Sequence, residues 1–486
     1  LEREIEGFQF PDELMPINQM GGVHQDLAEL AIMMPKRTEQ DYRNLIARMR
    51  AYPGLVDQTI ALMRRGLERG IIPPKAPLRG VEEAITDQIS GGPPASPLWQ
   101  IAFAKMPESI PAAEQAELRA EAFTVLGEEV MPALRRLREF WTEQYYPRTR
   151  GTVGLSALPN GEEWYEYNVR ESTTTDMSAD EIHELGLSEV ARIREEMEAI
   201  REEVGFEGTR QEFFAFLRTD PRFFFESEEM LLTAYRDIAK RIDPELPRLF
   251  GTLPRLTYGV VPIPEYSEQT QTTAYYQPGS PRAGRPGYFY ANTYDLDSRP
   301  KWEMEALTAH EAVPGHHLQI ALAQELEGVP AFRRFGGYTA FVEGWGLYSE
   351  SLGPELGLYE DPYSKFGQLT YEMWRAVRLV VDTGMHAKGW TRQQAIDFFK
   401  ENAGKAEHDI EVEIDRYIVW PGQALAYKIG ELKIKELRAQ AEQALGDAFD
   451  IREFHDAVLL AGPLPLSILE ARVEAWIEEE SLVARR

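Results

Sequence analysis

The chain has 486 residues, no cysteine and a formal net charge of −28, so it has no disulfides or thiol chemistry and is not expected to bind nucleic acid. Apolar residues make up 43% of the sequence, which suits a globular protein of one large domain or of two to three smaller ones. No apolar run approaches the roughly 20 residues of a membrane span. No basic, apolar leader follows Leu1, so we expect a soluble protein, cytoplasmic or exported with its leader removed, without membrane insertion.

Helical periodicity dominates the chain from its N-terminal part onward. Residues 57–71 and 116–141 place apolar side chains at helical spacing with charged residues between them. Ser178 and Glu181 have the spacing of a capping box, so we expect a helix to begin there and to continue to about residue 206. These patterns predict a mainly α fold.

Segments rich in Pro and Gly interrupt this pattern near residues 93, 155 and 282. The first two suggest an N-terminal helical region, residues 1–150, that packs on a helical region, residues 151–486, in one continuous unit. The third precedes "GYFYANTY", residues 287–294, whose aromatic and β-favouring residues predict a strand. We expect one small β-sheet beside the helix that follows.

That helix holds a cluster of histidines in "TAHEAVPGHHLQI", residues 308–320. The zinc-protease pattern His-Glu-x-x-His starts at His310 and Glu311, but Pro314 stands where the second histidine belongs. In an unbroken helix His316, six positions on, turns about 240° away from His310, and His317 lies about 10.5 Å further along the axis. Neither histidine could share a metal with His310 in a regular helix.

Pro314 makes a regular helix unfavourable, because it lacks an N–H and its ring clashes with the carbonyl of His310. The penalty is about 3 kcal/mol in a helix interior. We therefore predict that Pro314 and Gly315 form a two-residue bulge, which brings His316 to the i+4 position relative to His310. His316 is the preferred second ligand, and His317 is the alternative.

A third metal ligand is expected from the next helix. "TAFVEGWGLYSE", residues 339–350, supplies Glu343, with Gly344 and Gly346 beside it to allow a close approach. Two imidazoles and one carboxylate are typical ligands of catalytic zinc, and three protein ligands leave a position for water. Glu311 is then placed to take a proton from that water as general base, and later to return it to a leaving amine. The alternative is a surface glutamate on a Gly-rich packing face.

Such sites usually bind an extended substrate as an added strand. The predicted strand at residues 287–294 lies directly upstream of the histidines, so we expect it to be the edge strand that receives the substrate. Tyr290 and Asn292 are the candidate substrate-binding residues on it. The isolated histidines His24, His183, His408 and His455 are interpreted as surface or structural residues.

Three segments of the sequence, "HEAVPGHHLQ", "FVEGWGLYSE" and "RYIVWPGQALAYKIG", together resemble the bacterial family called domain of unknown function 885. That family is similar to the gluzincin metallopeptidases, which include thimet oligopeptidase, angiotensin-converting enzyme and carboxypeptidase Taq. The resemblance implies a helical, two-lobed fold with a deep cleft, one Zn²⁺ bound by His310, His316 and Glu343, and Glu311 as the base. It also implies short peptides as substrates.

Gluzincins need a hydrogen-bond donor for the oxyanion, and the resemblance places it in "RYIVWPGQALAYKIG", residues 416–430. Tyr427 is the first candidate for this donor, and Tyr417 the second. Arg416 and Lys428 are the candidates for binding a substrate carboxylate. The alternative is that Pro421 and Gly422 break a helix and that the tyrosines belong to the core.

Two other functions stay open at this point. The chain could hydrolyse a non-peptide amide or ester with the same residues, or it could be an inactive scaffold that binds peptides. The presence of Glu311 directly after His310 argues against the scaffold, because peptide binding alone does not require a base there. The sequence contains no indication of the oligomeric state.

Overall fold

The computed structural model describes residues 2–265, 268 and 271–484; Leu1 lies outside the described residues. The fold is mainly α, as predicted, with a single three-stranded sheet among the described residues. The chain divides into two compact units. The first comprises residues 1–164, 385–392 and 412–419, and the second comprises residues 165–384, 393–411 and 420–486. The two-lobed shape and the deep cleft stay predictions.

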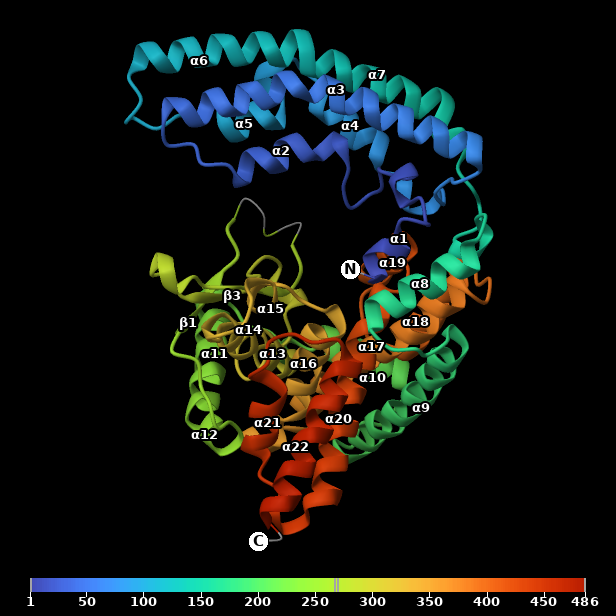
Figure 1. Cartoon of the computed structure of the whole chain (residues 1–486), viewed down its shortest axis with the longest axis vertical. Coiled ribbons are helices and arrows are strands. Elements are labelled where there is room, and N and C mark those ends of the chain that lie inside the picture. Colours follow the sequence, from blue (N-terminus) through green and yellow to red (C-terminus); the bar gives the residue numbers. More distant parts are fainter. Residues whose placement is uncertain (1, 266–267, 269–270, 485–486) are drawn as a thin grey trace. The chain divides into compact units, whose positions relative to one another are not determined.

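The described residues 2–160 contain seven α-helices: α1 (Glu2–Gly7), α2 (Val23–Met33), α3 (Glu39–Arg69), α4 (Val81–Ile89), α5 (Pro97–Ala102), α6 (Ala112–Val125) and α7 (Met131–Phe140). Helix α3 begins at a capping box made by Thr38 and Asp41. A π-helical turn joins α6 to α7, so both predicted helical segments of this region are helical. Helices α3, α6 and α7 run side by side and share one apolar core (Figure 1).

The remainder of the chain contains the other helices and the sheet: α8 (Gly161–Thr173), α9 (Ala179–Glu203), α10 (Arg210–Thr219), α11 (Glu228–Ile242), α12 (Leu246–Leu249), β1 (Tyr258–Pro262), β2 (Ala274–Gln277), β3 (Gly287–Ala291), α13 (Met304–Glu311), α14 (His316–Glu325), α15 (Ala331–Phe335), α16 (Thr339–Ser351), α17 (Pro362–His386), α18 (Arg392–Asn402), α19 (Glu407–Val419), α20 (Ala426–Leu445), α21 (Ile451–Leu459) and α22 (Leu466–Ala484). Ser178 and Glu181 form the predicted capping box at the start of α9.

The strand order of the sheet is β1-β3-β2. Strand β3 pairs with β1 in parallel and with β2 antiparallel, so its backbone hydrogen bonds are used on both sides. The expectation that residues 287–294 form an edge strand is therefore wrong, and the strand also ends earlier, at Ala291. A periodicity argument identifies a strand but not its neighbours, because pairing depends on residues distant in the sequence. The edges of the sheet are β1 and β2.

Helices α11, α13 and α14 pack on this sheet, and α16 packs on α13 and α14 (Figure 1). Helix α16 also crosses α20 at very short distance, where Gly344 meets Gly430. A Cβ atom on Gly430 would lie 1.8 Å from the carbonyl oxygen of Ala340, so only glycine fits at this crossing. This packing holds the helix that carries Glu343 in a defined position.

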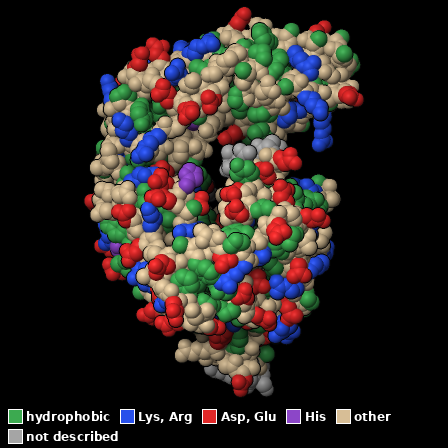
Figure 2. Space-filling model, turned by 180° about the vertical axis from the view of Figure 1, so that it is seen from behind, with side chains coloured by type: hydrophobic (Ala, Val, Ile, Leu, Met, Phe, Trp, Pro, Cys, Tyr) green, Lys and Arg blue, Asp and Glu red, His purple; other side chains and the backbone are tan. Residues whose placement is uncertain are grey.

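Figure 2 shows acidic and basic side chains mixed over one face of the molecule. The negative charges of this protein, whose net charge is −28, are therefore interspersed with positive ones on that face. None of the described helices has both the length and the apolar character that crossing a bilayer requires.

Candidate metal centre

The predicted bulge is a complete break between two helices. Helix α13 ends at Glu311, and α14 begins at His316 after a four-residue turn. Pro314 cannot donate a helical hydrogen bond, and the N–H of His317 donates instead to the carbonyl of Ala312, five residues back, at 3.0 Å. A Cβ atom on Gly315 would lie 1.9 Å from the carbonyl oxygen of His310. The Pro-Gly pair thus ends one helix and allows the next to start close to it.

This break brings the two predicted histidine ligands together. The imidazole rings of His310 and His316 lie edge to face with centroids 4.7 Å apart. The carboxylate oxygen Oε2 of Glu343 lies 3.5 Å from Nε2 of His310 and 3.6 Å from Nε2 of His316. All three ligand atoms lie within 4.8 Å of one another, and this arrangement can hold a metal ion.

Helix α16 organises the cluster from one side. Glu343 lies in its first half, and Trp345 donates a hydrogen bond from Nε1 to the carbonyl of Pro314 at 2.9 Å, which fixes the turn between α13 and α14. Gly346 faces the ring of His310, where a Cβ atom would lie 2.7 Å from Cε1. Of the two glycines expected to allow close approach, Gly346 therefore makes room for the ligand, and Gly344 makes room for α20.

Glu350 is a residue of the candidate site that the sequence interpretation missed. It is 1% exposed, and its Oε1 lies 2.8 Å from Nδ1 of His310 and 3.8 Å from the guanidinium of Arg375. This contact favours a proton on Nδ1 and leaves Nε2 free to bind a metal. The sequence holds one signal for it, since Glu350 follows Glu343 by seven residues and so shares its helix face. Its contact with His310, however, depends on the packing of two helices.

The charges of the cluster favour a bound cation. Burial lowers the pKa of His310, but the carboxylates of Glu343 and Glu350 outweigh it and raise this pKa to about 10. Burial raises the pKa of Glu343, but its contacts with His310 and His316 hold it well below the usual range. A metal-free cluster therefore attracts a proton, and a divalent cation would compete for the same place.

Glu311 follows His310 directly and is only partly buried. Its carboxylate is close enough to His310 to contribute to the raised pKa of that imidazole. Among the residues that the structure describes, none forms a hydrogen bond or an ion pair with the Glu311 carboxylate.

His317, the alternative ligand, faces the sheet. Its Nε2 donates to the carbonyl of Leu256 at 3.1 Å, and its Nδ1 lies 2.9 Å from the hydroxyl of Tyr276. Burial lowers its pKa to about 4. The structure therefore uses His317 to hold α14 on the sheet, and His316 is the histidine beside His310 and Glu343.

The residues predicted to bind substrate lie in several places. Tyr290 stacks on Tyr275, with centroids 4.9 Å apart. Asn292 is 1% exposed, and its amide donates to the carbonyls of residues 268, 271 and 272, so it holds a loop. Tyr427 lies on α20 with its ring 4.5 Å from the guanidinium carbon of Arg378.

Arg416 and Tyr417 lie on α19 in the first unit, and both contact Glu413, at 3.1 Å and 2.5 Å. Lys428 is fully buried, and its ammonium contacts Glu189, Glu372 and Glu431 at 2.6 to 3.0 Å. The carboxylates raise its pKa although burial opposes them. Lys428 therefore has no accessible ammonium for a substrate carboxylate, which corrects that prediction. A long side chain at a helix position can point inward, and spacing does not reveal which cations are buried with partners.

Residues 1–473 match the family described as bacterial protein of unknown function, DUF885. The fold is similar to a crystal structure described as "the putative lipoprotein from Colwellia psychrerythraea", with 34% identity and a TM-score of 0.89 over 95% of this chain and 80% of that chain. A "putative lipoprotein of unknown function from Shewanella oneidensis" shares 19% identity and a TM-score of 0.65 over 89% of this chain and 78% of that chain. No curated protein matches the chain.

Proposed function

The chain belongs to the DUF885 family of bacterial proteins, and we propose that it hydrolyses the amide bonds of short peptides with one bound zinc ion. The observation that carries this proposal is the convergence of His310, His316 and Glu343, whose ligand atoms lie within 4.8 Å of one another. Glu311 stands directly beside this cluster. A metal site with an adjacent carboxylate is the arrangement that metal-assisted hydrolysis requires.

The distances within the cluster support zinc. Ligand atoms about 2.0–2.1 Å from a tetrahedral ion lie roughly 3.3 Å from each other. The two distances from Glu343 to the histidines, 3.5 and 3.6 Å, are close to this value and longer than an ordinary hydrogen bond. Two imidazoles and one carboxylate are also the donor set of known catalytic zinc sites.

Each residue of the site has a distinct role in this proposal. His310, His316 and Glu343 would hold the ion, which would polarise the substrate carbonyl and lower the pKa of a water molecule. Glu311 accepts the proton of that water and returns it to the nitrogen of the leaving amine. Glu350 holds the ring of His310 in the orientation that directs Nε2 toward Glu343.

The sheet supports a peptide as the substrate. Strand β2, residues 274–277, is an edge strand that packs on α13, the helix of His310 and Glu311. An extended peptide can pair with the open side of such a strand, where backbone groups bind it independently of its side chains. In place of β3, β2 is therefore the strand that we assign to substrate binding. Tyr427 stays the candidate donor to the oxyanion.

Metal content and hydrolysis test the proposal together. We expect about one zinc per chain in protein purified without chelator, and hydrolysis of short peptides from a mixed library. Glu311→Gln should keep the zinc and lose activity by about 100-fold or more, because it removes the base and no ligand. Glu327→Gln, an exposed substitution of the same kind, should change neither value.

The outcomes distinguish the alternatives. Zinc with hydrolysis of esters or non-peptide amides, but of no peptide, would assign a different substrate to the same chemistry. Zinc and peptide binding without turnover in the wild type would identify a scaffold. Full activity in Glu311→Gln would remove this residue from the mechanism.

A further inference from the structure

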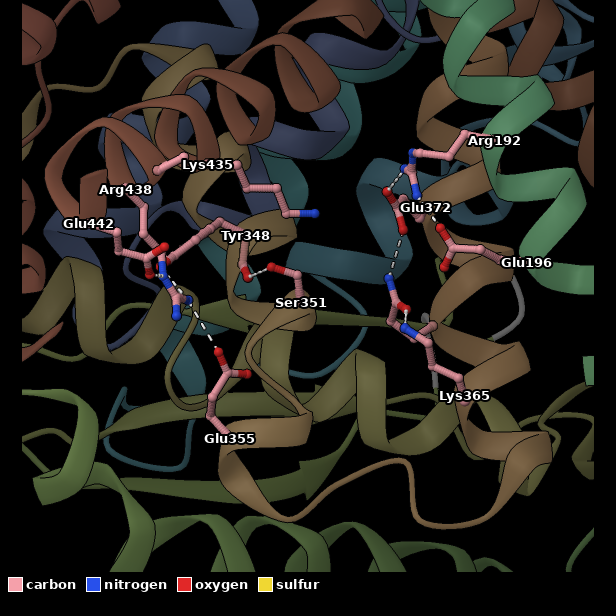
Figure 3. Close-up of a pocket in the computed structure, with 12 residues that line it drawn as sticks. Arg192, Glu196, Tyr348, Ser351, Glu355, Lys365, Glu372, Lys435, Arg438 and Glu442 are labelled. Atoms are coloured by element: carbon pink, nitrogen blue, oxygen red, sulfur yellow. Dashed lines mark hydrogen bonds and ion pairs between the residues drawn. The ribbon is translucent and has the colours of Figure 1, made fainter. Parts of the chain in front are cut away.

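The second unit contains a cavity that shares no residue with the candidate metal centre. It has a volume of about 380 Å³, and it lies between helices α9, α16, α17 and α20. This volume falls in the range of about 300–1,000 Å³ that is typical of small-molecule sites. Figure 3 shows the lining side chains in two groups on opposite sides of a central space.

Eight of the twelve lining residues are charged, four of each sign. The carboxylates already have cationic partners. Glu372 contacts Arg192 and Lys428 and accepts from Gln368, and Arg438 contacts Glu355 at 3.2 Å and Glu442 at 2.8 Å. Glu196 pairs with Arg192 at 2.6 Å. The acidic half of the lining is therefore neutralised within the protein.

The two lysines of the lining are in a different situation. The ammonium of Lys365 donates to the amide oxygen of Gln368 at 2.6 Å, and among the described residues no carboxylate lies within ion-pair distance of it. Burial lowers the pKa of Lys365, the carboxylates of Glu372 and Glu196 oppose this effect, and the charges of Lys435 and Arg192 lower the pKa further. Lys365 is thus a partly buried cation that has charges of both signs nearby but forms no ion pair with any described residue.

Lys435 approaches the same space from the other side. Its ammonium lies 2.5 Å from Glu431, which is not part of the lining, and an ammonium has three donors. In Figure 3 the side chain of Lys435 extends from its own group into the central space, toward the group that contains Lys365. Both lysines therefore have donors left for a ligand between them.

We propose that this cavity binds a small multivalent oxyanion, held by Lys365 and Lys435, whose charged groups are phosphates or carboxylates. Such an anion would supply the direct ion-pair partner that Lys365 lacks among the described residues, and it would relieve the repulsion of Lys365 from Lys435 and Arg192. The surrounding protein has a net charge of −28, so an anion is bound by these positioned cations and not by the general field. The proposal is independent of the metal centre and of hydrolysis.

Isothermal titration calorimetry at constant ionic strength tests this, with inorganic phosphate, pyrophosphate and citrate as separate titrants. We expect saturable binding of at least one of them to the full chain. Lys365→Met and Lys435→Met should each weaken it at least tenfold. Lys433→Met is the matched control, because Lys433 lies on the same helix but pairs with Glu436 at 2.8 Å and does not line the cavity. The affinity of Lys433→Met for the anion should stay within twofold of that of the wild type.

The three titrants also identify the chemical group that carries the negative charge of the ligand. Binding of phosphate or pyrophosphate but not citrate assigns a phosphoryl ligand, and the reverse assigns a carboxylate. Circular dichroism melting confirms that each variant is folded, and Lys365→Gln replaces Lys365→Met if the latter is not. No saturable binding of any of the three anions to the wild type would refute the proposal. Equal affinities in the wild type and in both lysine variants would refute it as well.

Discussion

His24 in the first unit and His310 in the second are equally buried, at 2% and 3% exposure, but their surroundings differ. His24 lies among mostly apolar side chains, no described residue forms a hydrogen bond with either of its ring nitrogens, and burial lowers its pKa to about 4. His310 has carboxylates at 2.8 and 3.5 Å, and its pKa is raised to about 10. Burial alone therefore disfavours a cation on an imidazole, and buried carboxylates reverse this preference.

The same contrast separates a core histidine from a candidate metal ligand. His183 and His455 are also buried, and each contacts a hydroxyl group: His183 that of Thr383 at 2.8 Å, and His455 that of Tyr348 at 2.9 Å. His455 has no carboxylate partner among the described residues. Their interpretation as structural residues agrees with these contacts.

The largest expected effect is a loss of zinc affinity when a histidine of the carboxylate-rich cluster is replaced. His316→Ala removes one of the three proposed ligands and should weaken zinc binding by about 100-fold or more, since zinc in a four-ligand structural site contributes roughly 10–16 kcal/mol in total. His317→Ala removes a contact to the sheet and should keep the zinc. Competition with a chromophoric chelator measures both affinities. A greater loss in His317→Ala would reassign the ligand.

The apolar surroundings of His24 predict that the free energy of unfolding depends on pH. The pKa of His24 falls from 6.5 in the unfolded chain to about 4 in the folded protein. Between these values the unfolded chain binds the proton and the folded protein does not. His24 therefore reduces the free energy of unfolding as the pH falls from 6.5 toward 4, by about 3 kcal/mol, and has no such effect above pH 6.5.

Denaturant unfolding of the wild type and of His24→Leu, at several pH values from 7.5 to 4.5, measures this effect. The other buried histidines titrate in both proteins and cancel in the difference. We expect a shallower loss of stability in His24→Leu at acidic pH. Parallel curves for the two proteins would show that His24 is not responsible.

A smaller loss of zinc affinity is expected when the negative charge beside His310 is removed. Glu350→Gln keeps an oxygen that can accept the hydrogen bond from Nδ1 but removes the negative charge. Zinc affinity should fall by about 10- to 100-fold, as for other partners of metal-binding histidines. Glu303→Gln changes a carboxylate that is similarly buried and contacts none of the three candidate ligands, so its zinc affinity should be unchanged. Equal losses in both variants would indicate a general loss of stability.

Local patterns in the sequence were sufficient to predict a mainly helical fold, the start of α9 and the candidate ligands. Helical periodicity and capping depend on residues within one or two turns, and the clash of Pro314 with the carbonyl of His310 is also a local event. For this reason the break between His310 and His316 could be anticipated, although its form as two helices could not.

Only the tertiary structure decided the features that depend on residues distant in the chain. It placed β3 between β1 and β2, joined Glu350 to His310 across 40 positions, and buried Lys428 among carboxylates from two other helices and its own. It also placed Lys365 near Lys435. Each of these contacts reflects the packing of whole helices and strands, and a single sequence contains no direct record of which faces meet.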